Sequence, residues 1–213
     1  MLLNLSLIAA LAITAGNTGA QTAPVTLDVD ATHATERLVH THERMVVQTG
    51  PLTLSYPEWY PGEHAPTGRV GNIGGLFFRA SGKTIPWRRD LTDAYAFHLT
   101  IPPDVHELEV DFDYLLPEGV ASARVMLLRW DQLLLYQANS PVSTIPFAAH
   151  LKLPNGWEFA SALRGEQSAD GITFESASLE TMLDVPYTMG LRYPHLERIE
   201  GKEDLLSGIL APR

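Results

Sequence analysis

The stretch Val105-His-Glu-Leu-Glu-Val-Asp-Phe-Asp-Tyr114 alternates apolar and acidic side chains. Its apolar members are Leu108, Val110, Phe112 and Tyr114, and its acidic members are Glu107, Glu109, Asp111 and Asp113. Successive side chains of a β-strand point to opposite faces of a sheet, so this period of two predicts a strand with one buried and one solvated face. We interpret the acidic side as a water-facing surface rather than as a pair of catalytic carboxylates.

Similar short apolar runs, separated by Pro and Gly, lie on both sides of this stretch. We expect further strands at 25–29, 36–48, 52–56, 75–80, 95–101, 122–130, 133–137, 146–153 and 171–175. A short helix is expected over 178–185, with Ser178 as its N-cap and Pro186 as its stop. The pattern predicts a mainly β fold, a twisted antiparallel β-sandwich with long loops and at most one or two short helices.

Length and composition restrict the class of protein. The 213 residues are 45% hydrophobic and 19% charged, which is typical of a globular chain with a sizeable core. The net charge of -10 argues against nucleic acid as a partner, because phosphate contacts require clustered Lys and Arg. There is no cysteine, so neither disulfides nor thiolate metal ligands support the fold.

The amino terminus differs from the remainder of the chain. Residues 1–20 carry no charge, contain an apolar run from Leu2 to Ala15 and close with small residues before Gln21. This pattern predicts a signal peptide and export to the periplasm or the extracellular space, with an uncleaved anchor as the alternative. The run is too short and too interrupted for a stable membrane span. We expect one β-sandwich domain over 21–190 and a divergent tail over 191–213.

The segment 58–74 contains two Pro and four Gly after residue 60 and predicts a long loop, either functional or purely structural. Its aromatic residues Trp59 and Tyr60, with Trp87, Trp130 and Trp157 elsewhere, would line a ligand groove or pack into turns and core. We favour packing. The cations Arg88 and Arg89 lie beside the Trp87 indole and could bind a carboxylate or form a cation-π pair. A salt bridge with Asp90 or a neighbour is the simpler interpretation.

Two segments begin with His-Glu, as the zincin motif HExxH does: His42-Glu43 and His106-Glu107. The motif needs two His residues four apart on one face of a helix, with the Glu beside them. Here the fifth residue is Val in both segments, and residues four apart on a strand are about 13 Å apart at roughly 3.3 Å per residue. His40 and His42 share a face and would bind a metal only with a third ligand, which no spacing supplies, so a polar surface is the simpler interpretation.

Several longer strings resemble the amino-terminal domain of the glycyl aminopeptidase family of zinc metallopeptidases, metallopeptidase family sixty-one. They are LVHTHERM from Leu38, GPLTLSYPEWYPGEHAPTG from Gly50, GLFFRASGKTIPWRRDLTDAYAFHLTIP from Gly75, RWDQLLLYQANSPVSTIPF from Arg129 and LKLPNGWEFASAL from Leu151. They occur in the family's order and cover about 25–190. After about Leu191 the chain no longer resembles the family.

The resemblance implies an exported enzyme in which a β-rich domain precedes a gluzincin catalytic domain, with HExxH and a zinc ion, and a PDZ-like domain. The catalytic domain is missing here, so no catalytic or metal residue is carried over, no cofactor is expected in this chain, and zinc belongs to the missing domain. By analogy with other gluzincin aminopeptidases, the loop bearing Tyr60, Glu63 and His64 is expected to face the substrate cleft.

The leading hypothesis is a non-catalytic accessory domain that packs on a gluzincin catalytic domain, in cis or in trans, and helps shape its cleft for a peptide substrate. Whether the chain has enzyme activity stays open, and without HExxH we expect it to be inactive alone. The alternative is a free-standing exported β-sandwich module that binds peptides or glycans, with a partly aromatic cleft near Trp59. A third possibility is a peptidase with an unrecognised site.

Overall fold

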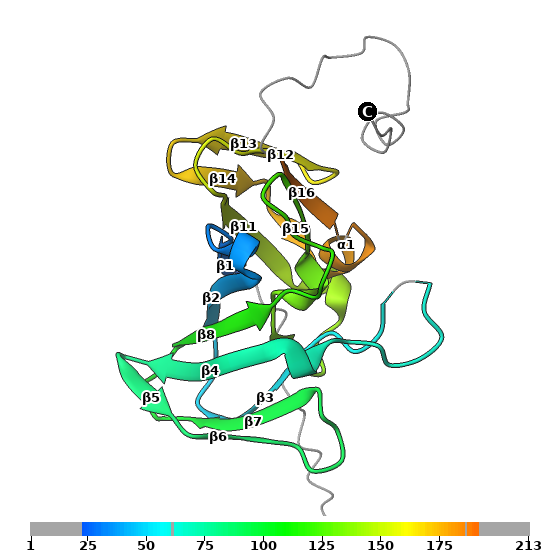
Figure 1. Ribbon diagram of the computed structural model, residues 1–213. Coiled ribbons are helices and arrows are strands. Elements are labelled where there is room, and N and C mark those ends of the chain that lie inside the picture. Colours follow the sequence, from blue (N-terminus) through cyan, green and yellow to red (C-terminus); the bar gives the residue numbers. More distant parts are fainter. Residues whose placement is uncertain (1–22, 61, 186, 192–213) are drawn as a thin grey trace, which may run out of the picture.

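A computed structural model of the chain describes residues 23–60, 62–185 and 187–191 (Figure 1). These residues form three β-sheets joined by loops and short helical turns. The predicted signal peptide at 1–20, the predicted helix stop Pro186 and positions 192–213 of the predicted tail lie outside the described residues.

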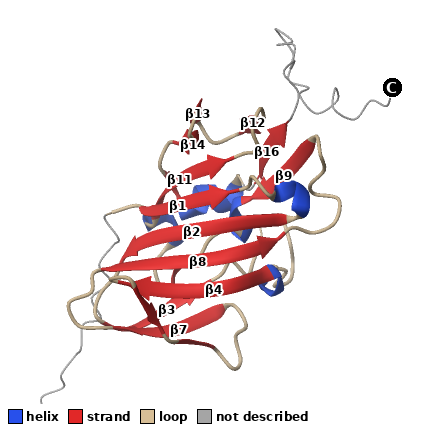
Figure 2. Cartoon of the chain, turned by 60° about the vertical axis from the view of Figure 1, so that its left-hand side comes forward, coloured by secondary structure: helices blue, strands red, loops and turns tan. Residues whose placement is uncertain are grey.

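The largest sheet has nine strands in the order β13-β14-β11-β1-β2-β8-β4-β5, with β15 paired to β11 beside this path. Its strands are β1 (Val25–Asp30), β2 (Leu38–Val46), β4 (Ile73–Ala80), β5 (Lys83–Ile85), β8 (Glu107–Leu115), β11 (Pro146–Lys152), β13 (Gly165–Ser168), β14 (Gly171–Phe174) and β15 (Ala177–Ser178). Figure 2 shows β11, β1, β2, β8 and β4 as one twisted layer. Its pairs are antiparallel except that β1 and β11 run parallel.

Two smaller sheets complete the strand structure. One has the order β10-β3-β7-β6 and the other β12-β16-β9. Their strands are β3 (Gly50–Ser55), β6 (Trp87–Arg89), β7 (Ala96–Ile101), β9 (Val125–Arg129), β10 (Tyr136–Gln137), β12 (Glu158–Ser161) and β16 (Tyr187–Leu191). The helical elements are α1 (Leu179–Asp184) and the 3-10 turns η1 (Ala34–Glu36), η2 (Val70–Asn72), η3 (Trp130–Gln132) and η4 (Val142–Thr144).

A single hydrophobic core joins the inner faces of these sheets. Phe112 of the large sheet, Leu54 and Phe97 of the four-stranded sheet and Leu128 of the three-stranded sheet all belong to it. The apolar members of the alternating stretch are completely buried at Leu108, Val110, Phe112 and Tyr114. The predicted mainly β, antiparallel sandwich is therefore confirmed.

Local expectations are confirmed where the chain carries a regular pattern. Each expected strand overlaps an observed one, although 130–132 form a 3-10 turn and the pairing of the expected strand 133–137 is limited to Tyr136–Gln137. Helix α1 begins as predicted, with Oγ of Ser178 accepting from the backbone N–H of Thr181 at 3.1 Å. The strands β5, β6, β12, β13, β15 and β16 were not expected.

Candidate functional site

Hydrogen bonds close the base of the long loop between β3 and β4. The backbone N–H of Gly68 donates to the carbonyl of Glu58 at 3.0 Å. The hydroxyl of Tyr95 donates to the carbonyls of Pro66 and Gly68 at 3.3 and 3.2 Å. A Cβ at Gly68 would lie 2.2 Å from the carbonyl oxygen of Pro57, so glycine is required for this closure.

Tyr60 anchors the loop to the three-stranded sheet. Its ring is 5% exposed, and its hydroxyl accepts from the backbone N–H of Arg69 at 3.2 Å. The guanidinium carbon of Arg129 lies 4.5 Å from the centre of the Tyr60 ring and 5.1 Å from the centre of the Tyr187 ring. Arg129 also donates to the Tyr187 hydroxyl at 3.1 Å. Both ring contacts are within the range of cation-π attraction.

Asp131 completes this group, which we call the Arg129 cluster (Tyr60, Arg129, Asp131 and Tyr187). Nε and Nη2 of Arg129 donate to the two carboxylate oxygens of Asp131 at 3.1 and 2.5 Å, a bidentate geometry. Asp131 is completely buried, and burial raises the pKa of its carboxyl while Arg129 opposes the rise. Burial also raises the pKa of the Tyr60 phenol, with Asp131 adding to the effect. The cluster is thus a fixed, partly buried cation between two aromatic rings.

The three residues that the sequence suggested for the substrate-facing loop lie in different environments. Tyr60 is a buried part of the Arg129 cluster, whereas Glu63 and His64 are exposed. The backbone N–H of Glu63 donates to the carbonyl of Tyr60 at 3.0 Å, so the backbone at Glu63 is tied to the anchor. Next to the anchor, Trp59 is 55% exposed, and Tyr187 on β16 is 45% exposed. This end of the domain therefore combines a rigid base with exposed aromatic side chains.

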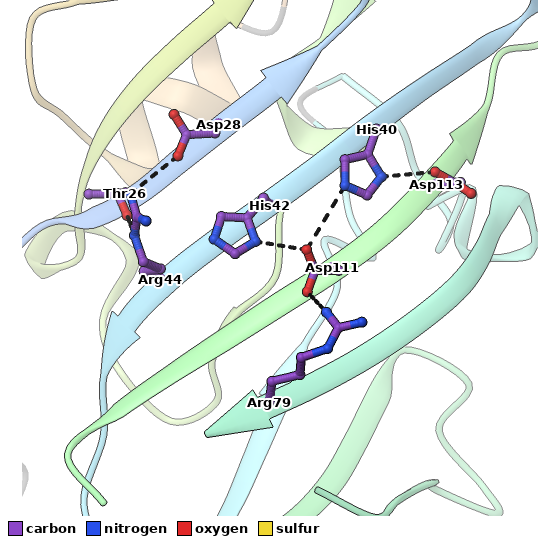
Figure 3. A network of polar contacts seen from close by, with 8 residues as sticks. All are labelled: Thr26, Asp28, His40, His42, Arg44, Arg79, Asp111 and Asp113. Carbon is purple, nitrogen blue, oxygen red and sulfur yellow. Dashed lines mark hydrogen bonds and ion pairs between the residues drawn. The ribbon is translucent and has the colours of Figure 1, made fainter. Parts of the chain in front are cut away.

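A second polar group covers the outer face of the large sheet (Figure 3). Oδ1 of Asp111 lies 2.8 Å from Nδ1 of His42 and 3.9 Å from Nε2 of His40. Nδ1 of His40 is 3.0 Å from Asp113, and Arg79 donates to the second oxygen of Asp111. His40 and His42 share one face, as predicted, and take part in a hydrogen-bonded polar surface.

The strand register extends this group into rows in which basic and acidic side chains alternate. The rows are His150-Asp28-His42-Asp111, Lys152-Asp30-His40-Asp113 and Arg44-Glu109-Arg79. Opposite charges on facing positions stabilise a sheet, and like charges there destabilise it. A cleft of about 1030 Å³ opens over part of these rows, lined by Asp28, His42, His150 and Trp157.

The two segments that begin like a zincin motif do not have the geometry of a gluzincin zinc centre in the described residues. On β2 the side chain of His42 lies on the outer face and that of Glu43 is completely buried on the inner face. The residues four positions after His42 and His106 are Val46 and Val110. In the part of the chain that is described, no group of three or more His, Asp or Glu is placed to hold a metal ion. The described residues also contain no helix long and apolar enough to cross a membrane.

Most of the aromatic residues pack inside, as expected. Trp130 and Trp157 are 1% and 5% exposed, and Trp87 is 37% exposed with its ring on Phe78 and Phe97. The expected salt bridge of Arg88 or Arg89 with Asp90 or a neighbour is wrong, since neither arginine takes part in an ion pair among the described residues and the guanidinium of Arg89 lies over the Phe97 ring. Asp90 pairs with His98 at 2.8 Å, because β6 and β7 are adjacent strands and bring His98 to it.

Sequence reasoning did not identify Arg129, Asp131 or Tyr187 as a site. Arg129 and Asp131 are two positions apart at the end of a predicted strand, which is a weak signal for an ion pair. Tyr187 faces Arg129 only because β16 pairs with β9, with Tyr187 in register with Arg129. Trp130 supports this pairing, since its indole N–H donates to the Thr188 hydroxyl at 3.0 Å.

Comparison with known proteins identifies the fold. A family model described as the Peptidase M61 N-terminal domain matches residues 26–191. An aminopeptidase N family protein from Idiomarina loihiensis superposes with a TM-score of 0.65 at 15% identity, over 78% of this chain and 29% of that one. An M1 zinc metallopeptidase from Deinococcus radiodurans gives a TM-score of 0.46 at 10% identity, over 78% of this chain and 41% of that one. Among curated proteins, none matches the sequence.

The chain thus spans less than half of the length of either solved protein. The family model covers β1 almost from its start and continues to the end of β16, so it includes the loop, the Arg129 cluster and the rows of the outer face. The chain belongs to the Peptidase M61 N-terminal domain family.

Proposed function

We propose that this chain is the non-catalytic amino-terminal domain of a glycyl aminopeptidase-like metallopeptidase, exported to the periplasm or the extracellular space. Its role is to pack on a gluzincin catalytic domain, supplied in cis or in trans, and to help shape the cleft in which a peptide substrate binds. Zinc then belongs to that partner. Family membership over 26–191 is the observation that carries this proposal.

The end that carries the Arg129 cluster is the surface we assign to the catalytic partner. Trp59 and Tyr187 are more than 40% exposed there, and burying aromatic area is favourable at about 25 cal/mol per Å². Aromatic side chains and arginine are the residues enriched among the energetically dominant positions of interfaces. The hydrogen bonds that fix the loop at Tyr60 and Gly68 reduce the entropy lost when it docks.

Association with a separately expressed gluzincin catalytic domain of a glycyl aminopeptidase tests the proposal. We expect the full chain to form a complex in sedimentation velocity and to increase the chelator-sensitive hydrolysis of glycyl-p-nitroanilide. Replacing both Trp59 and Tyr187 with Ser should weaken the complex at least about tenfold, since two exposed aromatic anchors are lost. The matched control is Val46→Ser, an equally exposed apolar position at the far end of β2.

Two results would count against the assignment. A chain that stays monomeric beside the catalytic domain at high micromolar concentration would contradict the accessory role. A complex that forms but is weakened by the Val46 change and not by the aromatic double change would place the interface elsewhere.

A further inference from the structure

A hydroxyl, an imidazole and a carboxylate are aligned on the face of the four-stranded sheet that points away from the core. Oγ1 of Thr53 lies 2.9 Å from Nδ1 of His98, and Nε2 of His98 lies 2.8 Å from Oδ2 of Asp90. Thr53 on β3 and His98 on β7 are directly opposite in the strand register. The neighbours of His98 on β7, Phe97 and Leu99, are buried in the core, so His98 faces outward.

The charge state of Asp90 fixes the direction of both hydrogen bonds. The hydrogen bond from His98, followed by those from Thr92 and Asp93, holds the pKa of Asp90 well below its usual range. An ionised carboxylate only accepts hydrogen bonds, so Nε2 of His98 carries its proton. In the neutral imidazole, Nδ1 then has a free lone pair, and the Thr53 hydroxyl donates to it. This is the polarity that a general base needs beside a nucleophile.

Small molecules can reach this group. Two hollows of about 510 and 590 Å³ open on the sheet, and Thr53 and His98 line both of them. Arg88 lines the smaller hollow and lies opposite His98 on β6. Its side chain forms none of the ion pairs found among the described residues, so the guanidinium is available for an anionic oxygen.

We propose that Thr53, His98 and Asp90 form an acyl-transfer site for small carboxylic esters, independent of any zinc peptidase activity. Oγ1 of Thr53 attacks the ester carbonyl while Nδ1 of His98 takes the hydroxyl proton, and Arg88 stabilises the oxyanion. The C–O bond of the ester breaks, His98 returns the proton to the leaving alcohol, and an acyl-Thr53 ester remains. Water then attacks the carbonyl of this ester while Nδ1 of His98 takes a proton from it. The bond between the acyl carbon and Oγ1 of Thr53 breaks and His98 returns the proton to Oγ1, which releases the carboxylic acid and regenerates the Thr53 hydroxyl. Asp90 is a positioning residue that sets the imidazole tautomer.

The test is reaction of the full chain with p-nitrophenyl acetate, followed by p-nitrophenol release and intact-mass analysis. We expect an adduct of one acetyl group that maps to Thr53 and is absent in Thr53→Ala, while Thr53→Ser keeps both adduct and turnover. His98→Gln should lower the rate of acylation at least about 100-fold, within the range for loss of a general base. Asp90→Asn should also lower the rate of acylation. Asp90→Glu should restore this rate, because it returns a carboxylate to His98; a merely structural role of Asp90 does not predict this difference between Asn and Glu.

The matched control is His106→Gln, an exposed histidine outside this group, which leaves the rate unchanged. Far-ultraviolet circular dichroism verifies that each variant is folded. Equal rates for the wild-type chain and a folded Thr53→Ala variant, or an acetyl group that maps to lysines or to other histidines, would overturn the proposal. Neither result would bear on docking to a catalytic domain.

Discussion

Replacing Glu43 with Gln tests how a carboxyl group is accommodated in the core. Glu43 lies on the inner face of β2, between Leu27 of β1 and Val110 of β8, and is completely buried. Its Oε1 accepts from the backbone N–H of Leu135 at 2.7 Å, and its Oε2 has no hydrogen-bond partner among the described residues. Burial raises the pKa of Glu43 well above its usual range, although the hydrogen bond from Leu135 opposes the rise.

This pKa shift links stability to pH with a definite sign. Below the usual pKa of a glutamate, about 4.3, the side chain is protonated in both the folded and the unfolded chain. Above it, the unfolded chain releases the proton while the folded chain keeps it. The free energy of unfolding therefore falls by about 1.4 kcal/mol for each pH unit until the raised folded pKa is reached. Glutamine does not titrate, so Glu43→Gln removes this slope and gains stability over the wild type as pH rises.

Urea unfolding followed by tryptophan fluorescence, at intervals from pH 5 to 6.5, measures the slope. At pH 5 we expect Glu43→Gln to be about 1 kcal/mol less stable, because its amide adds an unpaired buried N–H. Glu43→Leu removes the acceptor for the backbone N–H of Leu135 and should lower the free energy of unfolding by about 1–3 kcal/mol at pH 5. Like the Gln variant, it should lack the dependence of stability on pH that Glu43 causes. Glu107→Gln, at an exposed position of β8, is the control and should follow the wild type. Parallel curves for wild type and Glu43→Gln would refute the reasoning.

Three further predictions concern the loop, the core and the Arg129 cluster. Gly68→Ala should destabilise the domain by about 1–3 kcal/mol and expose the loop to limited proteolysis, because the new Cβ meets the Pro57 carbonyl. Thr41→Val should raise the melting temperature by about 2–4 °C in a thermal scan, since the buried Thr41 hydroxyl has no partner among the described residues. Arg129→Ala should cost about 3–5 kcal/mol in urea unfolding, and Asp131→Asn in the same chain should recover part of it, because the Ala variant leaves Asp131 buried and unpaired.

Sequence reasoning succeeded where the information is local. The period of two in β8 identified both its buried and its solvated face, and the same rule placed His40 and His42 on one side of β2. Ser178 was predicted as a helix cap from its residue type and its place before the expected helix, and its hydroxyl accepts the expected N–H. Each of these features depends on residues within a few positions of one another.

The missed elements depend on distant partners. β16 is only five residues long and is defined by pairing with β9 and β12. β13 has the polar sequence Gly-Glu-Gln-Ser and is an edge strand, so it carries no apolar alternation. The Arg129 cluster joins residues from three separate segments, and Thr53 and His98 meet only through strand register. No spacing rule connects such positions before the sheets are known.

The outer face of the large sheet and the surface at the Arg129 cluster differ in what a partner would gain by covering them. On the outer face, Asp111 already has His42 and Arg79 as partners. A partner that buried these pairs would have to offset the free energy of removing their charges from water. At the other surface, Trp59 and Tyr187 expose apolar area over a base that is already fixed by Arg129. Covering these rings releases water without breaking an ion pair. A catalytic domain that docks on this chain therefore gains more from the loop and β16 than from the large sheet, whose charged rows remain in water.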